Sequence, residues 1–302
     1  MSGVGITRGA GMALATMVFG TACMGPRAST RSVMSGSTVP TAAACFSVAT
    51  LSPADRRVAE QVILEFADRE GLYTLGDGVK PISSDVRDLL VRIAPTLDTS
   101  ALVTLEQQRR VAAALTCGEI GVFVQVFTAT QRRRDSSEVR NTSMVIFHRA
   151  AVRRTIEAHR SFFAMLGVTP STDPREVVLA VENAPRSPRW RGYGYLFGYP
   201  DDAVDFFVRA GEEGDANGTL VPRDFRRIDT WHKSPASTGA APTMSSFVFA
   251  VPKGAPESEQ EGRLRAAAAP VYARYVQARG AAIQPDSTGA LALFRGWLTA
   301  RR

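Results

Sequence analysis

Residues 119–130 read EIGVFVQVFTAT, a run in which β-branched and aromatic side chains predominate. Such side chains favour extended backbone, so the run predicts a strand. Residues 139–147 (VRNTSMVIF) predict a second strand, and the polar stretch QRRRDSSE lies between the two. Two strands joined by a polar turn are typical of an antiparallel hairpin. The sheet of this protein is therefore expected to be antiparallel.

Helices are predicted before and after this hairpin. Ser52-Pro53-Ala54-Asp55 is typical of a helix start, because serine caps the first turn, proline suits its first position and an acid stabilises its positive end. Val58, Val62 and Phe66 continue that helix with one apolar stripe. Further helices are predicted at 101–116, 149–166, 174–182, 201–210, 257–279 and 291–300.

The remaining segments decide the fold class. Strands are predicted at 190–197, 225–231 and 246–251, whereas residues 88–93 fit either a strand or a helix. Strand pairs separated by helices indicate an α+β fold, here with a mainly antiparallel sheet of about four to five strands packed with several helices. Because residues 45–302 contain no internal repeat and no linker-like stretch, we expect them to form one domain.

The first 22 residues have the three parts of a secretory signal peptide. Arg8 supplies a positive charge, residues 11–22 (GMALATMVFGTA) are apolar, and small residues precede Cys23. The apolar run is shorter than the roughly 20 residues that a bilayer-spanning helix needs. The cysteine resembles the processing site of bacterial lipoproteins, whose thiol is lipidated after cleavage, although Gly20 stands where a larger aliphatic residue is usual.

This start predicts the compartment of the mature protein. Residues 23–44 are rich in Ser, Thr, Ala and Gly, and they predict a flexible tether between the anchor and the domain. We expect an extracytoplasmic protein of a bacterial envelope, either a lipoprotein attached to the membrane through Cys23 or a simply secreted periplasmic protein.

Cysteine usage agrees with export. If Cys23 carries a lipid, Cys45 and Cys117 remain in an oxidising compartment. A disulfide between them is the natural pairing, and two unpaired buried thiols are the alternative.

The charge of the chain is basic, at +7, and all but three of its 36 basic residues are arginine. A basic balance suggests anionic partners, such as anionic or carbohydrate components of the envelope, while an arginine-rich composition alone is the alternative explanation. Nucleic acid is not expected as a partner of an exported chain. Residues 131–160 hold eight arginines against three acids, so the predicted hairpin tip at Arg132–Arg134 could rest on an anionic membrane, or could be a solvated loop.

Standard catalytic and cofactor motifs are missing from the sequence. It contains no H-E-x-x-H, C-x-x-C or G-x-S-x-G pattern. Gly71 and Gly76 have the spacing of a phosphate-binding loop, but Asp77 follows where lysine is required. We therefore expect no metal and no cofactor.

The aromatic segment 190–199 is the leading candidate for a binding surface. If it is extended, alternate residues share one face, which would carry tyrosines and a guanidinium suited to sugars or anionic aromatic ligands. The predicted ligand-binding residues are Arg189, Arg191, Tyr193, Tyr195 and Tyr199. The alternative is a strand packed into the core, whose glycines allow a helix to approach.

Three functions follow from these observations. The first is an exported, lipid-anchored envelope protein that binds a ligand or partner through the aromatic and arginine surface. The second is an envelope hydrolase in which His232 acts with a nearby carboxylate, Asp229 or Asp205. The third is a structural envelope component, which would show a broad exposed apolar patch instead of a pocket.

Overall fold

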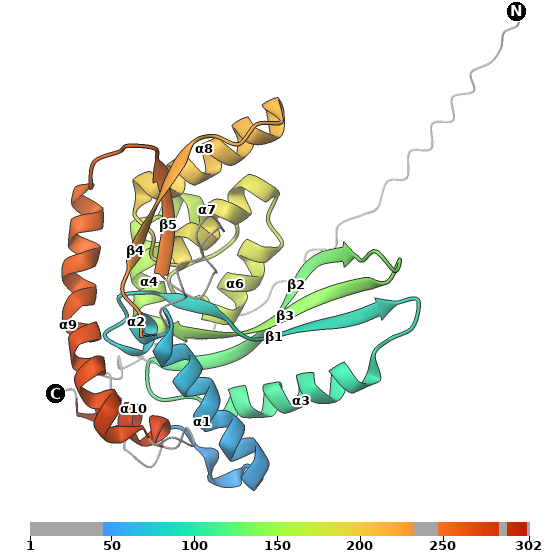
Figure 1. Ribbon diagram of the computed structural model, residues 1–302, viewed down its shortest axis with the longest axis vertical. Coiled ribbons are helices and arrows are strands. Elements are labelled where there is room, and N and C mark those ends of the chain that lie inside the picture. The colour runs from blue at the N-terminus through green and yellow to red at the C-terminus, as the bar shows by residue number, and fades with distance from the viewer. Residues whose placement is uncertain (1–44, 232–246, 284–288, 301–302) are drawn as a thin grey trace, which may run out of the picture. The chain divides into compact units, whose positions relative to one another are not determined.

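The structure is a computed structural model that describes residues 45–231, 247–283 and 289–300 (Figure 1). Its elements before the aromatic segment are η2 (Val48–Thr50), α1 (Pro53–Asp68), α2 (Leu72–Leu75), β1 (Ile82–Ala94), α3 (Thr99–Ala114), β2 (Ile120–Arg132), β3 (Glu138–His148), α4 (Arg149–Ala158), α5 (Arg160–Met165) and α6 (Pro174–Glu182). The later ones are α7 (Arg186–Leu196), α8 (Asp201–Asn217), β4 (Arg223–Ile228), β5 (Phe247–Pro252), α9 (Glu259–Ala282) and α10 (Ala290–Thr299).

The predicted α+β class is confirmed, and the sheets are antiparallel. The strands divide between two sheets, one with the order β1-β3-β2 and one formed by β4 and β5. The predicted hairpin is present, with Val124 of β2 opposite Met144 of β3. Residues 88–93, which the sequence left open, belong to strand β1.

The central strand β3 divides two hydrophobic cores, because its successive side chains point to opposite faces. Met144 and Ile146 lie in the first core, and Val145 and Phe147 lie in the second. The first core is built by α1, α2, β5, α9 and α10, through residues that include Val62, Phe66, Tyr73, Phe247, Tyr275 and Phe294. The second core is built by α4 to α7, through residues that include Ile156, Phe163, Val177, Val181 and Leu196.

Several predicted helices are confirmed together with their end signals. The Ser52 hydroxyl accepts a hydrogen bond from the Asp55 backbone N–H at 3.1 Å and so caps α1. Helix α6 has the predicted bounds, 174–182. The single helix predicted for 149–166 is instead divided at His159 into α4 and α5.

The strand predicted at 190–197 is wrong, because residues 190–196 belong to helix α7 and Phe197 is its C-cap. A Cβ atom added to Gly192 would lie 2.8 Å from the methyl groups of Val181, and one added to Gly194 would lie 2.7 Å from Val204. The two glycines therefore let α7 pack closely between α6 and α8. Residues 192–195 alternate glycine with tyrosine and so imitate the period of a strand, although the two glycines serve helix packing.

The predicted disulfide between Cys45 and Cys117 is confirmed. Both cysteines lie in the first core and are 1% and 2% exposed. The bridge joins residues 72 positions apart, and closing a loop of that length stabilises the fold by about 4 kcal/mol in the chain-entropy model. Arg295 of α10 reinforces this corner by donating to the Cys45 carbonyl oxygen at 3.0 Å.

The described residues belong to one compact unit. None of the helices in the described ranges has the length and apolar content needed to cross a membrane. The predicted signal peptide at 1–22, the lipidation site Cys23 and the tether at 23–44 lie outside the described residues, as does His232.

Candidate functional site

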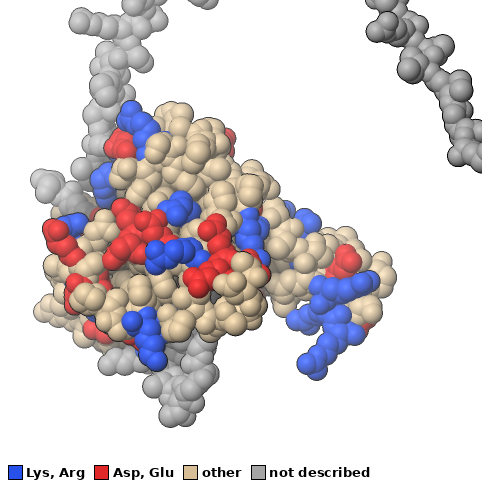
Figure 2. All heavy atoms as spheres, turned by 90° about the horizontal axis from the view of Figure 1, so that it is seen from above, with Lys and Arg blue, Asp and Glu red and all other residues tan. Residues whose placement is uncertain are grey.

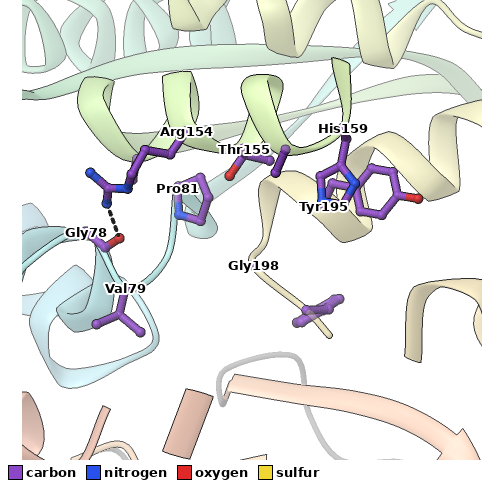
Figure 3. A pocket seen from close by; sticks show the side chains of 11 residues that line it. Gly78, Val79, Pro81, Arg154, Thr155, His159, Tyr195 and Gly198 are labelled. Carbon is purple, nitrogen blue, oxygen red and sulfur yellow. Dashed lines mark hydrogen bonds between the residues drawn. The ribbon is translucent and has the colours of Figure 1, made fainter. Parts of the chain in front are cut away.

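A surface hollow of about 280 Å³ lies beside helix α4 (Figure 3). Its wall on one side is α4, and the opposite wall is the segment 78–81 that leads into β1. The chain that leaves α7 closes one end. The lining residues are Gly78, Val79, Pro81, Ala151, Arg154, Thr155, Ala158, His159, Tyr195, Gly198 and Tyr199.

Helical spacing explains the α4 wall. Residues 151, 154, 155 and 158 lie on one stripe of the helix, since positions three and four apart are neighbours. The two alanines in this stripe are small and leave space, whereas Arg154 and Thr155 bring polar groups to it. The Arg154 guanidinium donates to the Gly78 carbonyl oxygen at 3.4 Å, as the dashed line in Figure 3 marks.

Gly78 is required at the opposite wall. Its φ is +62°, a conformation that favours glycine, and an added Cβ would lie 2.8 Å from the His148 ring. His148 itself is the N-cap of α4 and is largely buried. The tight contact between the 78–81 segment and the start of α4 therefore fixes the depth of the hollow.

His159 closes the other end of the α4 wall, at the break between α4 and α5. Its ring stacks on Tyr195 with a centroid separation of 3.7 Å and an angle of 7° between the planes. Its Nε2 lies 3.4 Å from an Asp201 carboxylate oxygen. Burial lowers the pKa of His159 below its usual value of 6.5, an effect that Asp201 opposes and Arg191 reinforces. The imidazole is therefore mainly neutral at neutral pH.

The predicted ligand-binding residues separate into two groups. Tyr195 and Tyr199 line the hollow. Arg191, one helical turn before Tyr195, donates to its hydroxyl at 3.1 Å and also pairs with Asp205. Desolvation by burial acts to lower the pKa of Arg191, but its bonds to Asp205 and Tyr195 outweigh this and raise it. Arg191 thus positions Tyr195 but does not itself line the hollow.

Arg189 and Tyr193 face a different part of the molecule. The Tyr193 hydroxyl donates to Glu182 at 2.8 Å, and Arg189 lies 3.8 Å from the same carboxylate. Thr128 of β2 also donates to Glu182 through both its backbone N–H and its hydroxyl. Burial raises the pKa of Tyr193 far above its usual value, and the nearby Glu182 adds to that effect. These residues join β2 to α6 and α7, and the predicted common face does not exist, because α7 has a helical period.

Lys80 is adjacent to the hollow, but its side chain is not part of the lining. Its neighbours Val79 and Pro81 line the hollow, whereas the Lys80 side chain is completely buried in the first core. Its Nζ lies 2.7 Å from a Glu70 carboxylate oxygen and 4.2 Å from the centre of the Phe247 ring. The rings of Phe197 and Tyr199 complete an aromatic cage around it.

The predicted hydrolase residues are only partly described. Asp229 follows β4, and its backbone oxygen accepts a hydrogen bond from the Tyr73 hydroxyl. Its proposed partner His232 lies outside the described residues. Asp205 bonds to Arg191 at the surface of α8. Within the described ranges, no group of three His, Cys, Asp or Glu side chains could hold a metal ion.

Neither Arg154 nor His159 is among the site residues that the sequence analysis predicts. Both become site residues because α4 ends at 158 and because segment 78–81 packs across it. No protein-family model, curated protein or solved structure matches this chain.

Proposed function

We propose that this is an exported, lipid-anchored envelope protein that binds a small anionic ligand in the hollow beside α4. One observation carries the proposal: Arg154 and His159 stand at the two ends of one hollow, with the Thr155 hydroxyl between them. At 1.5 Å per residue, their backbones are roughly 7 to 8 Å apart along α4, a span that suits a small molecule.

The charge of the site favours an anion. A guanidinium has five N–H donors in a planar fork, so Arg154 can hold the Gly78 oxygen and an anionic group together. Protonation of His159 would add a second cation at the other end of the hollow. Because burial lowers the pKa of His159 below 6.5, this second charge is expected only in acidic solution.

The apolar part of the lining narrows the ligand class. Val79, Pro81, Ala151 and Ala158 give the hollow an apolar wall beside the cationic groups. Apolar walls with a few polar groups are typical of small-molecule sites. A phosphate or carboxylate attached to a compact apolar body fits both features.

Phenyl phosphate and phenol form a suitable probe pair, because they share the apolar body and differ in charge. We expect isothermal titration calorimetry to detect binding of phenyl phosphate and little binding of phenol. Arg154→Gln should weaken phenyl phosphate binding about tenfold or more, as expected for loss of a charge-assisted contact. Arg153→Gln is the matched control, because Arg153 is exposed on the same helix but lines a different hollow.

A substitution that fills the hollow provides an independent test. Ala158→Leu places a larger apolar side chain in the hollow and should prevent binding. Because Ala158 is exposed, the melting temperature should stay close to that of the parent. If Arg154→Gln and Arg153→Gln weaken phenyl phosphate binding equally, general charge attraction would explain the binding. That result would overturn the proposed site. If phenyl acetate is hydrolysed and His232→Ala abolishes that turnover, the hydrolase alternative replaces this proposal.

The export part of the proposal needs its own experiment. Mass spectrometry of the protein recovered from its native cell should find an N-terminus at Cys23 carrying a lipid. A protein recovered from the cytosol with Met1 still attached would contradict both export and anchoring. The binding experiment is independent of this outcome.

A further inference from the structure

The far end of the three-stranded sheet carries an unusual combination of side chains. There β2 turns into β3, and β1 passes into α3 (Figure 1). We use the name arm tip for Arg92, Leu97, Val103 and the three consecutive arginines Arg132–Arg134 at this end. The hollow beside α4 is not part of it.

The arginines of the arm tip project into solvent. All three arginines of the run 132–134 are exposed. Figure 2 shows basic side chains gathered at one projecting end of the molecule. Their turn is held in shape by Asp135, which accepts hydrogen bonds from the Ser137 N–H at 3.0 Å and the Ser137 hydroxyl at 2.6 Å. Among the ion pairs of the described residues, none includes Arg132 or Arg134.

Acidic groups near the arm tip are held by local contacts. The Asp135 carboxylate is bonded within its own turn, and these bonds to Ser137 lower its pKa. Asp98 caps α3 by accepting from the Ala101 N–H at 3.1 Å. Glu138 lies opposite Arg132 across the hairpin. Asp98 and Asp135 are therefore both engaged in hydrogen bonds with residues close to them in the sequence.

Apolar side chains are exposed at the same end. Val103 is 73% exposed and Leu97 is 47% exposed, and Leu102 between them in the sequence is also exposed. Single exposed apolar residues are common on protein surfaces, but three within seven residues and beside an arginine cluster form a patch. Leu90 of β1 is also 40% exposed.

We propose that the arm tip docks on an anionic lipid membrane. Arginines near such a surface are attracted to lipid phosphates, and exposed leucine and valine side chains can enter the boundary between headgroups and acyl chains. A soluble polyanion would use the arginines alone and would leave Leu97 and Val103 in water. The presence of both kinds of side chain therefore favours a membrane over a soluble polyanion. This inference goes beyond ligand binding and does not depend on it.

Vesicle sedimentation tests the role of the charges. The full chain carrying Cys23→Ser, which removes lipidation, is mixed with phosphatidylcholine vesicles that contain roughly one-third phosphatidylglycerol or none. We expect binding that requires phosphatidylglycerol and weakens as salt is raised. The triple variant Arg132→Glu, Arg133→Glu, Arg134→Glu should lower this binding about tenfold or more. Its matched control reverses three exposed arginines on other elements, Arg57, Arg175 and Arg209, which should change it little.

A second pair of variants tests the role of the apolar side chains. Leu97→Ser with Val103→Ser should weaken vesicle binding severalfold while leaving retention on a heparin column unchanged. Leu179→Ser with Leu220→Ser is the control, because these residues are as exposed but lie on α6 and after α8. Circular dichroism melting checks that every variant folds.

Two results would overturn the membrane proposal. One is equal loss of vesicle binding in the arm-tip and control charge variants, since the net charge alone would then explain it. The other is binding to heparin without binding to anionic vesicles, which would assign the arginines to a soluble polyanion. Neither result bears on the hollow, so the two proposals can fail separately.

Discussion

Glu70 and Glu182 are both buried carboxylates, one beside each core. The groups that compensate the negative charge differ between the two. Glu70 is 6% exposed and meets the ammonium of Lys80 at 2.7 Å. Glu182 is 2% exposed and accepts hydrogen bonds from Thr128 and Tyr193, with Arg189 at the longer distance of 3.8 Å. The first depends on one ionic partner, and the second on several donors.

The difference has an energetic meaning. Losing one partner of a buried ion pair leaves an uncompensated charge, which is among the most costly changes in a protein. A carboxylate held by several donors loses one hydrogen bond at a time. The first core should therefore be the more sensitive to a single substitution.

The sharpest test is Lys80→Met, which keeps an unbranched side chain of similar length and removes its charge. We expect a loss of up to about 5 kcal/mol in the free energy of unfolding, measured by urea denaturation, because Glu70 stays buried without its cation. Adding Glu70→Leu should restore most of this loss. A single variant that is nearly as stable as the parent would remove the contrast between the two carboxylates.

Removal of the disulfide should have the next largest effect, again through the first core. Cys45→Ser with Cys117→Ser is expected to lower the free energy of unfolding by about 4 kcal/mol. Hydrogen exchange should then lose protection in α1 and α3, which lie inside the loop that the bridge closes, more than in α6. A uniform loss across both cores would show that they do not respond separately.

The second core should respond more weakly, and Tyr193→Phe measures it. Loss of the hydroxyl that donates to Glu182 should cost about 2 kcal/mol, a value typical of a hydrogen bond to a charged group. Tyr195→Phe is the control on the same helix. Its half-buried hydroxyl also bonds a charged group, Arg191, but Arg191 keeps its ion pair with Asp205 when the hydroxyl is removed, so the loss should be less than about 1 kcal/mol. Similar losses in both variants would contradict the assigned role of Glu182.

The smallest effect concerns His159, which lies at the edge of the second core. Its pKa is lowered in the folded protein, so the unfolded chain takes up a proton first as the pH falls below about 6.5. Stability should therefore decline slightly from that pH downward, and His159→Gln should remove this part of the decline. Phenyl phosphate itself takes up a proton at about pH 6, so its affinity is compared between the parent and His159→Gln at each pH. The parent should bind increasingly better than His159→Gln as the pH falls, and a ratio of the two affinities that is independent of pH would exclude His159 from the site.

The elements with local signals could be predicted from the sequence, and those defined by distant contacts could not. The hairpin of β2 and β3, the cap of α1 at Ser52 and the bounds of α6 each depend on neighbouring residues. Helix α7 was predicted as a strand because Gly192 and Gly194 alternate with tyrosines. The two glycines pack against Val181 of α6 and Val204 of α8, and the local sequence does not indicate these contacts.

The candidate site was harder to predict than the fold. Tyr195 and Tyr199 were predicted because segment 190–199 is rich in aromatic residues. Both line the hollow. Arg154 resembled any exposed helical arginine, since nothing near it in sequence indicates that segment 78–81 packs across α4. Tyr193 was assigned to the same face as Tyr195, but a helical period turns it toward Glu182.

The disulfide also determines how the molecule would respond to mechanical force. Tension applied to the chain ahead of Cys45 passes through the sulfur atoms to Cys117, three residues before β2, instead of travelling through α1 and β1. Arg295 shares that strain by holding the carbonyl oxygens of Cys45 and Phe46. A protein pulled from its N-terminal side would thus resist extension at this corner, and the segment between Cys45 and Cys117, which are 72 positions apart, could not be stretched out until the bond is reduced.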